Sequence, residues 1–251
     1  MPPALLGAVP GDGFALALAA VLAAGVVYGF AGFGAALIAI PLLARATSPE
    51  VAVIAFGLAG LGSAATMLPR VWPQADKRAT LWMPLAAALF GLWVLVHGDP
   101  EALRWGICGL AGITLVGIVS GWRLRLSSGA GVRMALGGAA GALGGATGMT
   151  GPLVILTNLA SGDGAERMRA NLASFLTLTN FIFLPVLAAY GAVTAPALWL
   201  GAVLLPVYMV GTEVGARLHR PGRERLYRRI AYGVVGAAVL LGLPVWDGPP
   251  N

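Results

Sequence analysis

The sequence predicts an all-α polytopic membrane protein with two inverted repeats of four hydrophobic segments, the first segment of each repeat being broken or re-entrant. Three observations predict this class. Hydrophobic residues make up 58% and charged residues 10% of the chain, whereas soluble domains carry roughly 25% charged residues. Apolar runs of about 18 or more residues, long enough to cross a hydrocarbon core of ~30 Å, recur along the whole length. Glycine-rich stretches interrupt the longest run in each half.

Eight hydrophobic segments follow one another, and each should be helical because lipid-exposed backbone must satisfy its own hydrogen bonds. The segments cover residues 14–44, 51–68, 80–96, 103–121, 132–160, 170–190, 196–216 and 230–245. Short connections rich in Gly, Pro, Ser and Asp separate them. One long segment followed by three short ones occurs twice, which predicts two repeats, residues 1–125 and 126–251, within one membrane domain.

Charge and composition exclude several classes of protein. The net charge of +6 comes mostly from Arg and Lys that flank apolar segments, so we expect a lipid bilayer as partner and no nucleic acid. Cys108 is the single cysteine, and His97 and His219 lack the spacing of metal ligands, so no metal site is expected. No His/Asp/Glu or Cys/His constellation lies within the apolar segments, so we predict no enzyme, no catalytic residue and no cofactor.

The 16 Lys and Arg residues favour one of two topologies. With eight simple crossings and an external N-terminus, they divide ten inside to six outside. In the second topology, segments 14–44 and 132–160 each enter and leave the membrane on the same side. The basic residues then divide fourteen inside to two outside, and only Arg45 and Arg104 lie outside. The positive-inside rule therefore favours re-entrant segments, inverted repeats and external termini, with kinked spans left open as the alternative.

Two glycine-rich stretches, residues 25–37 and 141–153, align without a gap and bring Gly32 onto Gly148. Each lies near the centre of its long apolar segment, which predicts a break at the level of the bilayer centre. Interrupted segments at matching positions of two halves indicate a transporter's binding site. The alternative is close helix packing, because small-xxx-small patterns also bring membrane helices together.

The interrupted segments predict a site for a small anion. A second half-helix begins after each break, near Gly34 and near Thr150, and N–H groups at a helix N-terminus attract negative charge. Backbone N–H groups and threonine hydroxyls would hold the anion without a buried lysine or arginine. The candidate substrate-binding residues are Phe30, Gly32, Phe33, Gly34, Gly145, Thr147, Gly148, Met149, Thr150, Gly151 and Asn180.

Two further polar residues lie inside predicted spans. Asn180 is midway along segment 170–190, where a polar side chain either faces the bundle interior or forms an interhelical hydrogen bond. Glu213 is the single acid inside a predicted span and could carry a coupling proton. Because Arg217 follows one helical turn later, an i,i+4 ion pair is the alternative interpretation.

At these residues the chain resembles the sulfite exporter TauE/SafE family of membrane transport proteins. The likeness lies in three motifs, Gly29-Phe30-Ala31-Gly32-Phe33-Gly34, Gly144-Gly145-Ala146-Thr147-Gly148-Met149-Thr150-Gly151 and Gly211-Thr212-Glu213-Val214-Gly215-Ala216-Arg217-Leu218. Their order and spacing within the eight-segment plan extend the resemblance over essentially the whole chain. The resemblance implies transport of sulfite, sulfonates or related small organosulfur anions.

We therefore expect a secondary carrier for a small anion, a sulfur oxyanion or sulfonate, in the inner membrane of a bacterium. An anion channel with the same site and a carrier for a non-sulfur organic anion are the alternatives. The expected partners are the small anionic substrate and the lipid bilayer, and a homodimer is left open.

Overall fold

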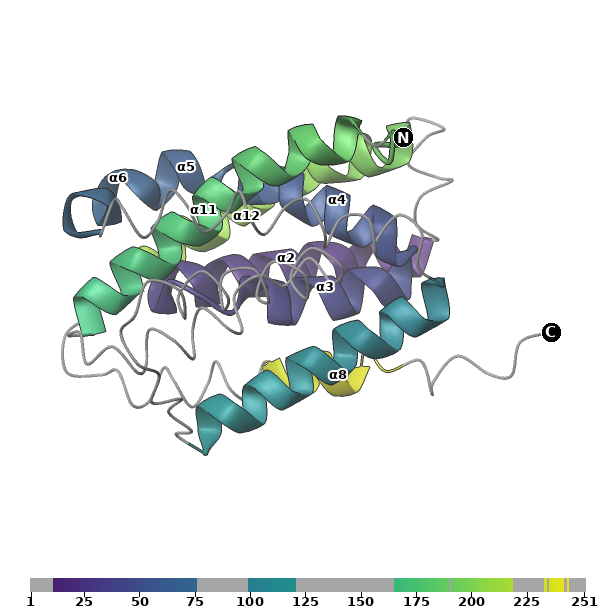
Figure 1. Ribbon diagram of the computed structural model, residues 1–251, viewed down its shortest axis with the longest axis horizontal. Coiled ribbons are helices and arrows are strands. Elements are labelled where there is room, and N and C mark those ends of the chain that lie inside the picture. Colours follow the sequence, from purple (N-terminus) through teal and green to yellow (C-terminus); the bar gives the residue numbers. More distant parts are fainter. Residues whose placement is uncertain are drawn as a thin grey trace, which may run out of the picture.

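The computed structural model of the chain describes residues 11–75, 99–120, 165–189, 191–218, 233, 235–241 and 243. All regular elements in these residues are helices, which confirms the predicted all-α class (Figure 1). They are α2 Gly11–Ala31, α3 Ala35–Ala46, α4 Pro49–Gly60, α5 Ser63–Thr66, α6 Leu68–Val71, the 3-10 helix η1 Trp72–Gln74, α8 Pro100–Val119, α11 Ala165–Ala189 and α12 Ala195–Leu218.

Among the described residues, four helical stretches are long and apolar enough to cross a membrane, so the chain is a multi-pass membrane protein, as predicted. They are Gly13–Ala31, Pro49–Thr66, Arg169–Ala189 and Ala195–Leu218. α3 is apolar as well, but its 12 residues give a length of about 18 Å, short of a hydrocarbon core of ~30 Å. The predicted segments 80–96 and 132–160 lie outside the described residues.

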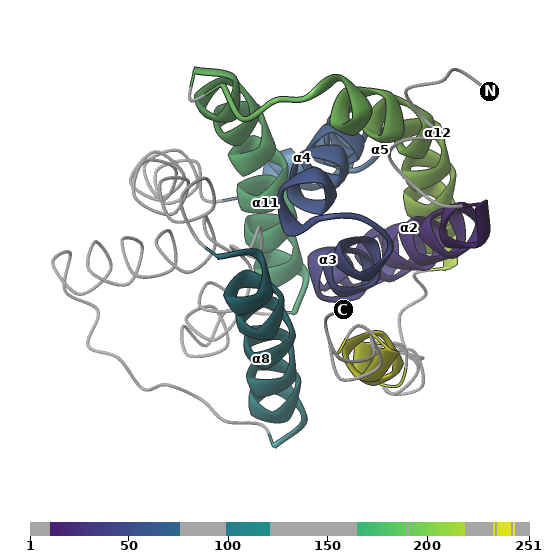
Figure 2. The ribbon, with the colours of Figure 1, turned by 90° about the vertical axis from the view of Figure 1, so that its right-hand side faces the viewer.

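The first predicted segment is two helices, α2 and α3, that pack side by side (Figures 1 and 2). α2 ends at Ala31 and α3 begins at Ala35. Between them, Gly32 has φ 79° and Gly34 has φ 92°, a left-handed backbone that glycine adopts without steric cost. A Cβ on Gly34 would lie 3.4 Å from Val27 Cγ1, so the start of α3 is beside the last turns of α2. The chain therefore reverses direction at this turn.

The second predicted segment, 51–68, is α4 followed by the short helices α5 and α6. Ser48 is the N-cap of α4, and its Oγ accepts a hydrogen bond of 3.3 Å from Val51 N–H. Pro49 occupies the first turn, where its missing N–H leaves no helical hydrogen bond unmade. Turns after Gly60 and at Met67 interrupt the helix, so the far half of this segment is irregular.

Contacts between helices give their relative directions. α2, α4 to α6 and α12 run one way, and α11 runs the opposite way. Leu58 neighbours Gly201 and Thr66 neighbours Thr212, so α4 and α5 run parallel to α12. Gly57 neighbours Leu184 and Ser63 neighbours Thr177, so α11 runs antiparallel to α4 and α5. Gly25 neighbours Gly211 and Phe30 neighbours Gly215, so α2 runs parallel to α12. Since α2 and α4 are parallel, α3 must return the chain between them.

α8 stands at the edge of the bundle beside the helical residues 235–241 (Figure 2). Gly112 approaches Val239, and Gly236 approaches Leu115, so α8 and these residues run antiparallel. Arg45 at the end of α3 ties this region to the bundle, because its Nη1 donates to Leu241 O at 2.6 Å.

α2 and α12 pack through glycines. A Cβ on Gly25 would lie 2.8 Å from Tyr208 O and 3.0 Å from Gly211 Cα. Gly29 and Gly215 approach the backbone of the facing helix more closely still. Two small-xxx-small patterns thus face each other, and in the first stretch Gly25 and Gly29 serve helix packing, the alternative that the sequence left open.

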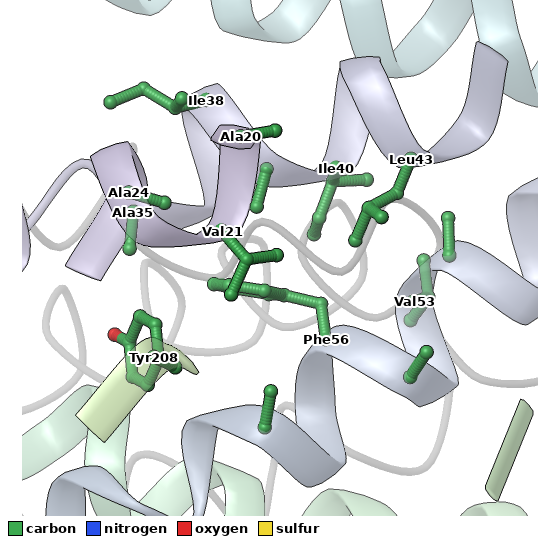
Figure 3. Packing of buried hydrophobic residues seen from close by; sticks show 14 of the residues in the cluster. Ala20, Val21, Ala24, Ala35, Ile38, Ile40, Leu43, Val53, Phe56 and Tyr208 are labelled. Carbon is green, nitrogen blue, oxygen red and sulfur yellow. The ribbon is translucent and has the colours of Figure 1, made fainter. Parts of the chain in front are cut away.

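Apolar side chains of α2, α3, α4 and α12 fill the space between these helices (Figure 3). Val21, Ile38 and Leu43 are fully or almost fully buried. Phe56 and Tyr208 meet edge to face, with ring centroids 5.6 Å apart. This core holds the hairpin of α2 and α3 against α4 and α12, and so positions the turn at its tip.

Candidate functional site

The turn between α2 and α3 lies against the first turns of α11. A Cβ on Gly32 would lie 2.6 Å from Arg169 Cγ and 3.0 Å from Arg169 O, so a larger residue would displace α11. Gly32 N–H donates to Tyr28 O at 2.7 Å, which closes the end of α2. Glycine is thus required here twice, for the left-handed backbone and for the close approach.

The predicted site residues of the first glycine stretch stay together at this turn. Gly32 and Gly34 are buried and Phe33 is half-buried between them. Phe30 is buried on the last turn of α2, where its backbone lies close to Gly215 of α12. Gly34 is the N-cap of α3, and no side chain of the described residues caps this helix. The first N–H groups of α3 therefore lie beside the turn without a capping side chain.

Arg169 on α11 reaches over the end of α2. Its Nη2 donates to Gly29 O at 2.6 Å and contacts Met67 Sδ at 3.8 Å. Its Nε is buried and has no hydrogen-bond partner among the described residues. The expectation of a site without an arginine is therefore wrong at the first break. Charge counting assigned Arg169 to a loop, but α11 already begins at Ala165.

The depth of the first break also differs from the prediction. Residues Gly13–Ala31 of α2 are by themselves long enough to cross the membrane. The break follows this stretch, so it lies at the end of a full-length helix and not at its centre. The neighbours of this end are charged, since Arg70, Arg169 and Arg217 gather around it. The sequence suggested two equal limbs, whereas the limbs have 21 and 12 residues.

A buried polar seam extends from the same region into the bundle, formed by Tyr28, Ser63 and Thr177. Tyr28 OH donates to Ala173 O at 2.8 Å and lies 3.0 Å from Thr177 Oγ1. Thr177 Oγ1 is 2.9 Å from Ser63 Oγ, which in turn bonds to Gly60 O. These hydroxyls join α2, α5 and α11.

Asn180 continues the line of the polar seam along α11. Its side-chain amide lies directly against Gly60, at the end of α4, inside the bundle. Asn180 follows Arg169 by 11 positions on α11, about 17 Å along the helix axis. The structure therefore does not bring Asn180 together with the turn at Gly32.

Glu213 on α12 is held by two arginines. Arg217 Nε donates to its Oε1 at 2.8 Å, which is the i,i+4 pair that the sequence offered as an alternative. Arg70 Nη2, from α6, lies 3.0 and 2.8 Å from its two carboxylate oxygens. The Arg70 contact was not predicted, because nothing in the sequence places α6 beside α12. Glu213 therefore ties these two helices at a partly exposed end of the bundle.

The site residues predicted in the second glycine stretch lie outside the described residues. These residues are Gly145, Thr147, Gly148, Met149, Thr150 and Gly151. The structure accordingly describes only the predicted residues around the first break, and it places Arg169 beside them.

Comparison with known families gives one match. The family model described as sulfite exporter TauE/SafE matches residues 17–242, which cover nearly all of the membrane-spanning helices described above and both glycine stretches. The comparisons with curated proteins and with solved structures gave no match. With nearly its whole length matched, the chain belongs to the sulfite exporter TauE/SafE family of membrane transporters.

Proposed function

We propose that this protein is a secondary carrier that moves a small sulfur oxyanion or sulfonate, such as sulfite, across the membrane. The observation that carries the proposal is the glycine turn after α2, where left-handed backbone at Gly32 and Gly34 meets Arg169 in a chain of this transporter family. The uncapped N–H groups at the start of α3 are suitable donors for an anion.

The substrate site is proposed to lie between this turn and the second glycine stretch. Gly145, Gly148 and Gly151 would allow the backbone to come close to the anion, and Thr147 and Thr150 would add hydroxyl donors beside Met149. Asn180 belongs to this proposal as a residue of the inner path, further along α11. Glu213 is the candidate coupling residue, and its carboxylate would exchange partners between Arg70 and Arg217.

We further propose two inverted repeats, residues 1–125 and 126–251, with re-entrant first segments, external termini and a location in the bacterial inner membrane. The helix directions support this arrangement. Eight simple crossings would make α4 antiparallel to α12, whereas the two are parallel. Simple crossings would also make α8 parallel to residues 235–241, whereas they are antiparallel.

Binding of the anion tests the proposed function first. The purified protein is screened by thermal shift against sulfite, thiosulfate, sulfate, methanesulfonate and acetate. We expect sulfite or a sulfonate to raise the melting temperature more than acetate does. A larger stabilisation by acetate would favour the alternative, a carrier for a non-sulfur organic anion.

Transport in proteoliposomes separates a carrier from an anion channel. A carrier shows saturable uptake and counterflow, in which unlabelled substrate inside the vesicles accelerates uptake of labelled substrate. Uptake that grows linearly with concentration and shows no counterflow would contradict the carrier and support the channel.

A further inference from the structure

We infer that Arg169 supplies the fixed positive charge that binds the transported oxyanion, and that the guanidinium at the glycine turn is the specificity-determining group of the site. This inference rests on the proposed function and deepens it. The sequence alone pointed to an anion site made only of backbone N–H groups and hydroxyls.

The guanidinium of Arg169 has an unused donor. A guanidinium has five N–H donors in a rigid fork. Arg169 uses Nη2 on Gly29 O and on Met67 Sδ, while its Nε is buried without an acceptor among the described residues. Buried donors are almost always paired, and an ion that occupies the site is one of the few ways to account for an exception.

Arg169 also forms no direct ion pair in the part of the chain that the structure describes. The ion pairs found there join Glu213 to Arg70 and Arg217, and none of them includes Arg169. Glu166, one turn earlier on α11, forms no ion pair with Arg169 in the same set of residues. Partial burial of a charge costs free energy, and an anion beside the guanidinium would offset that cost.

The groups that neighbour Arg169 suit an oxyanion. Gly32 has no side chain to separate Arg169 from the turn, and the uncapped start of α3 follows two residues later. An oxyanion with several oxygens on one centre can accept from the guanidinium fork and from backbone N–H groups at the same time. Sulfite and sulfonates present three such oxygens. A lysine would offer a point charge without the fork.

A purely structural role for Arg169 predicts different behaviour. If its only task is to bond Gly29 O at the end of α2, removing it should lower the thermal stability of the unliganded protein and leave the affinity for anions unchanged. The affinity for sulfite, measured separately from stability, therefore distinguishes the two roles.

The test compares Arg169→Gln and Arg169→Lys with the matched control Arg167→Gln, which removes an exposed arginine two residues away on the same helix. Each purified full-length variant is titrated with sulfite by calorimetry, and its unliganded melting temperature is recorded. We expect Arg169→Gln to raise the Kd for sulfite at least about ten-fold, as removal of a charged hydrogen-bond partner should. We expect Arg169→Lys to raise it about three-fold or more, because lysine keeps the charge but loses the fork, and Arg167→Gln to leave it unchanged.

Each result decides the inference. Sulfite binding by Arg169→Gln with the Kd of the wild type would overturn it and leave the proposed function intact. If Arg169→Gln does not fold, Arg169→Lys decides, since a lysine can still reach Gly29 O but lacks the Nε donor, and an unchanged Kd overturns the inference. If the wild type binds none of the sulfur oxyanions, the proposed function fails and the inference fails with it.

Discussion

Gly32 and Gly34 share a left-handed backbone but have different surroundings. A Cβ on Gly32 would collide with Arg169, whereas a Cβ on Gly34 would meet only Val27 Cγ1 at an ordinary 3.4 Å. Alanine at either position costs about 1–2 kcal/mol for the left-handed conformation. We predict that Gly32→Ala also displaces Arg169, and so lowers both the melting temperature and the sulfite affinity more than Gly34→Ala does. Equal effects in thermal unfolding and calorimetry would contradict this contact.

The polar seam allows a second comparison between neighbouring residues on one helix. Thr177 Oγ1 contacts Tyr28 OH and Ser63 Oγ on two other helices, whereas Thr179 Oγ1 donates only to Phe175 O of its own helix. We predict that Thr177→Val lowers the free energy of unfolding by roughly 0.5–2 kcal/mol, the range for interhelical hydrogen bonds in membranes. Thr179→Val should change it by less than about 0.5 kcal/mol. Unfolding in mixed detergent micelles measures the free energy of unfolding of both variants. A larger decrease for Thr179→Val than for Thr177→Val would contradict the stabilising role of the polar seam.

At the residue scale, the sequence predicted the turn correctly and missed the arginine. Gly32 and Gly34 could be predicted because closely spaced glycines inside an apolar run mark a place where the backbone leaves helical geometry. Arg169 could not, because counting charges per loop treats every arginine at a membrane edge alike. The sign that could have identified it is its position: Arg169 precedes the apolar run 170–190 directly, so the helix that carries this run also carries the charge into the bundle.

Among the helices, α2 and α12 come closest together because both expose glycines along one stripe. Gly25 and Gly29 of α2 face Gly211 and Gly215 of α12, so the two backbones are in direct contact. In lipid, where burial of apolar surface does not drive association, such close packing is a main source of helix affinity. α2 leads into the turn at Gly32 and α12 carries Glu213, so their contact also fixes the turn relative to this carboxylate.

We predict that Gly29→Ala separates α2 from α12 and lowers the free energy of unfolding by about 1–3 kcal/mol, as overpacking does. Gly109→Ala on α8 is the matched control, because no described residue lies within 4 Å of a Cβ at that position. There alanine should be neutral or raise stability by up to about 1 kcal/mol through its higher helix propensity. Both variants are unfolded in mixed detergent micelles, and equal stability of the two would argue against the glycine contact.

At the element scale, hydropathy predicted which helices exist better than where they begin. Segment 170–190 begins five residues after α11 does, because α11 opens with the charged residues Glu166, Arg167 and Arg169. An apolar segment ends where charged residues begin. A helix continues through charged residues as long as its backbone hydrogen bonds remain satisfied. The unequal limbs of the first hairpin were equally unpredictable, since their lengths depend on packing against α4 and α12.

For the whole molecule, the directions of the helices connect the hairpin to the charge distribution. A chain that turns back between α2 and α4 shifts every later crossing by one side of the membrane. Contacts between the helices place the arginines at the ends of α6 and α12 on the same side as the start of α11, where Arg70, Arg169 and Arg217 gather. The positive-inside rule favours this arrangement over simple crossings, and the parallel directions of α4 and α12 support it independently.

The topology itself gives the last prediction. If both long segments turn back, Asn251 lies outside the cytoplasm and the arginine-rich residues 217–229 lie inside. An alkaline phosphatase fused at Asn251 should be active, because it folds only outside, whereas a green fluorescent protein at the same position should be dark. As an independent measurement, Arg125→Cys in a Cys108→Ser background should react with a membrane-impermeant maleimide only after the cells are opened, whereas eight simple crossings would place Arg125 outside.

Labelling of Arg125→Cys in intact cells would mean that segment 14–44 crosses the membrane once, against the hairpin of α2 and α3. A fluorescent fusion would mean that only one of the two long segments crosses the membrane once. The hairpin of α2 and α3 would then point to segment 132–160 as the one that crosses. With that single crossing, α4 and α12 could not both be spans and run parallel, as they do. Because the labelling of Arg125→Cys and the parallel directions of α2 and α4 depend on the same turn of the chain, intact-cell labelling is the most direct challenge to the fold.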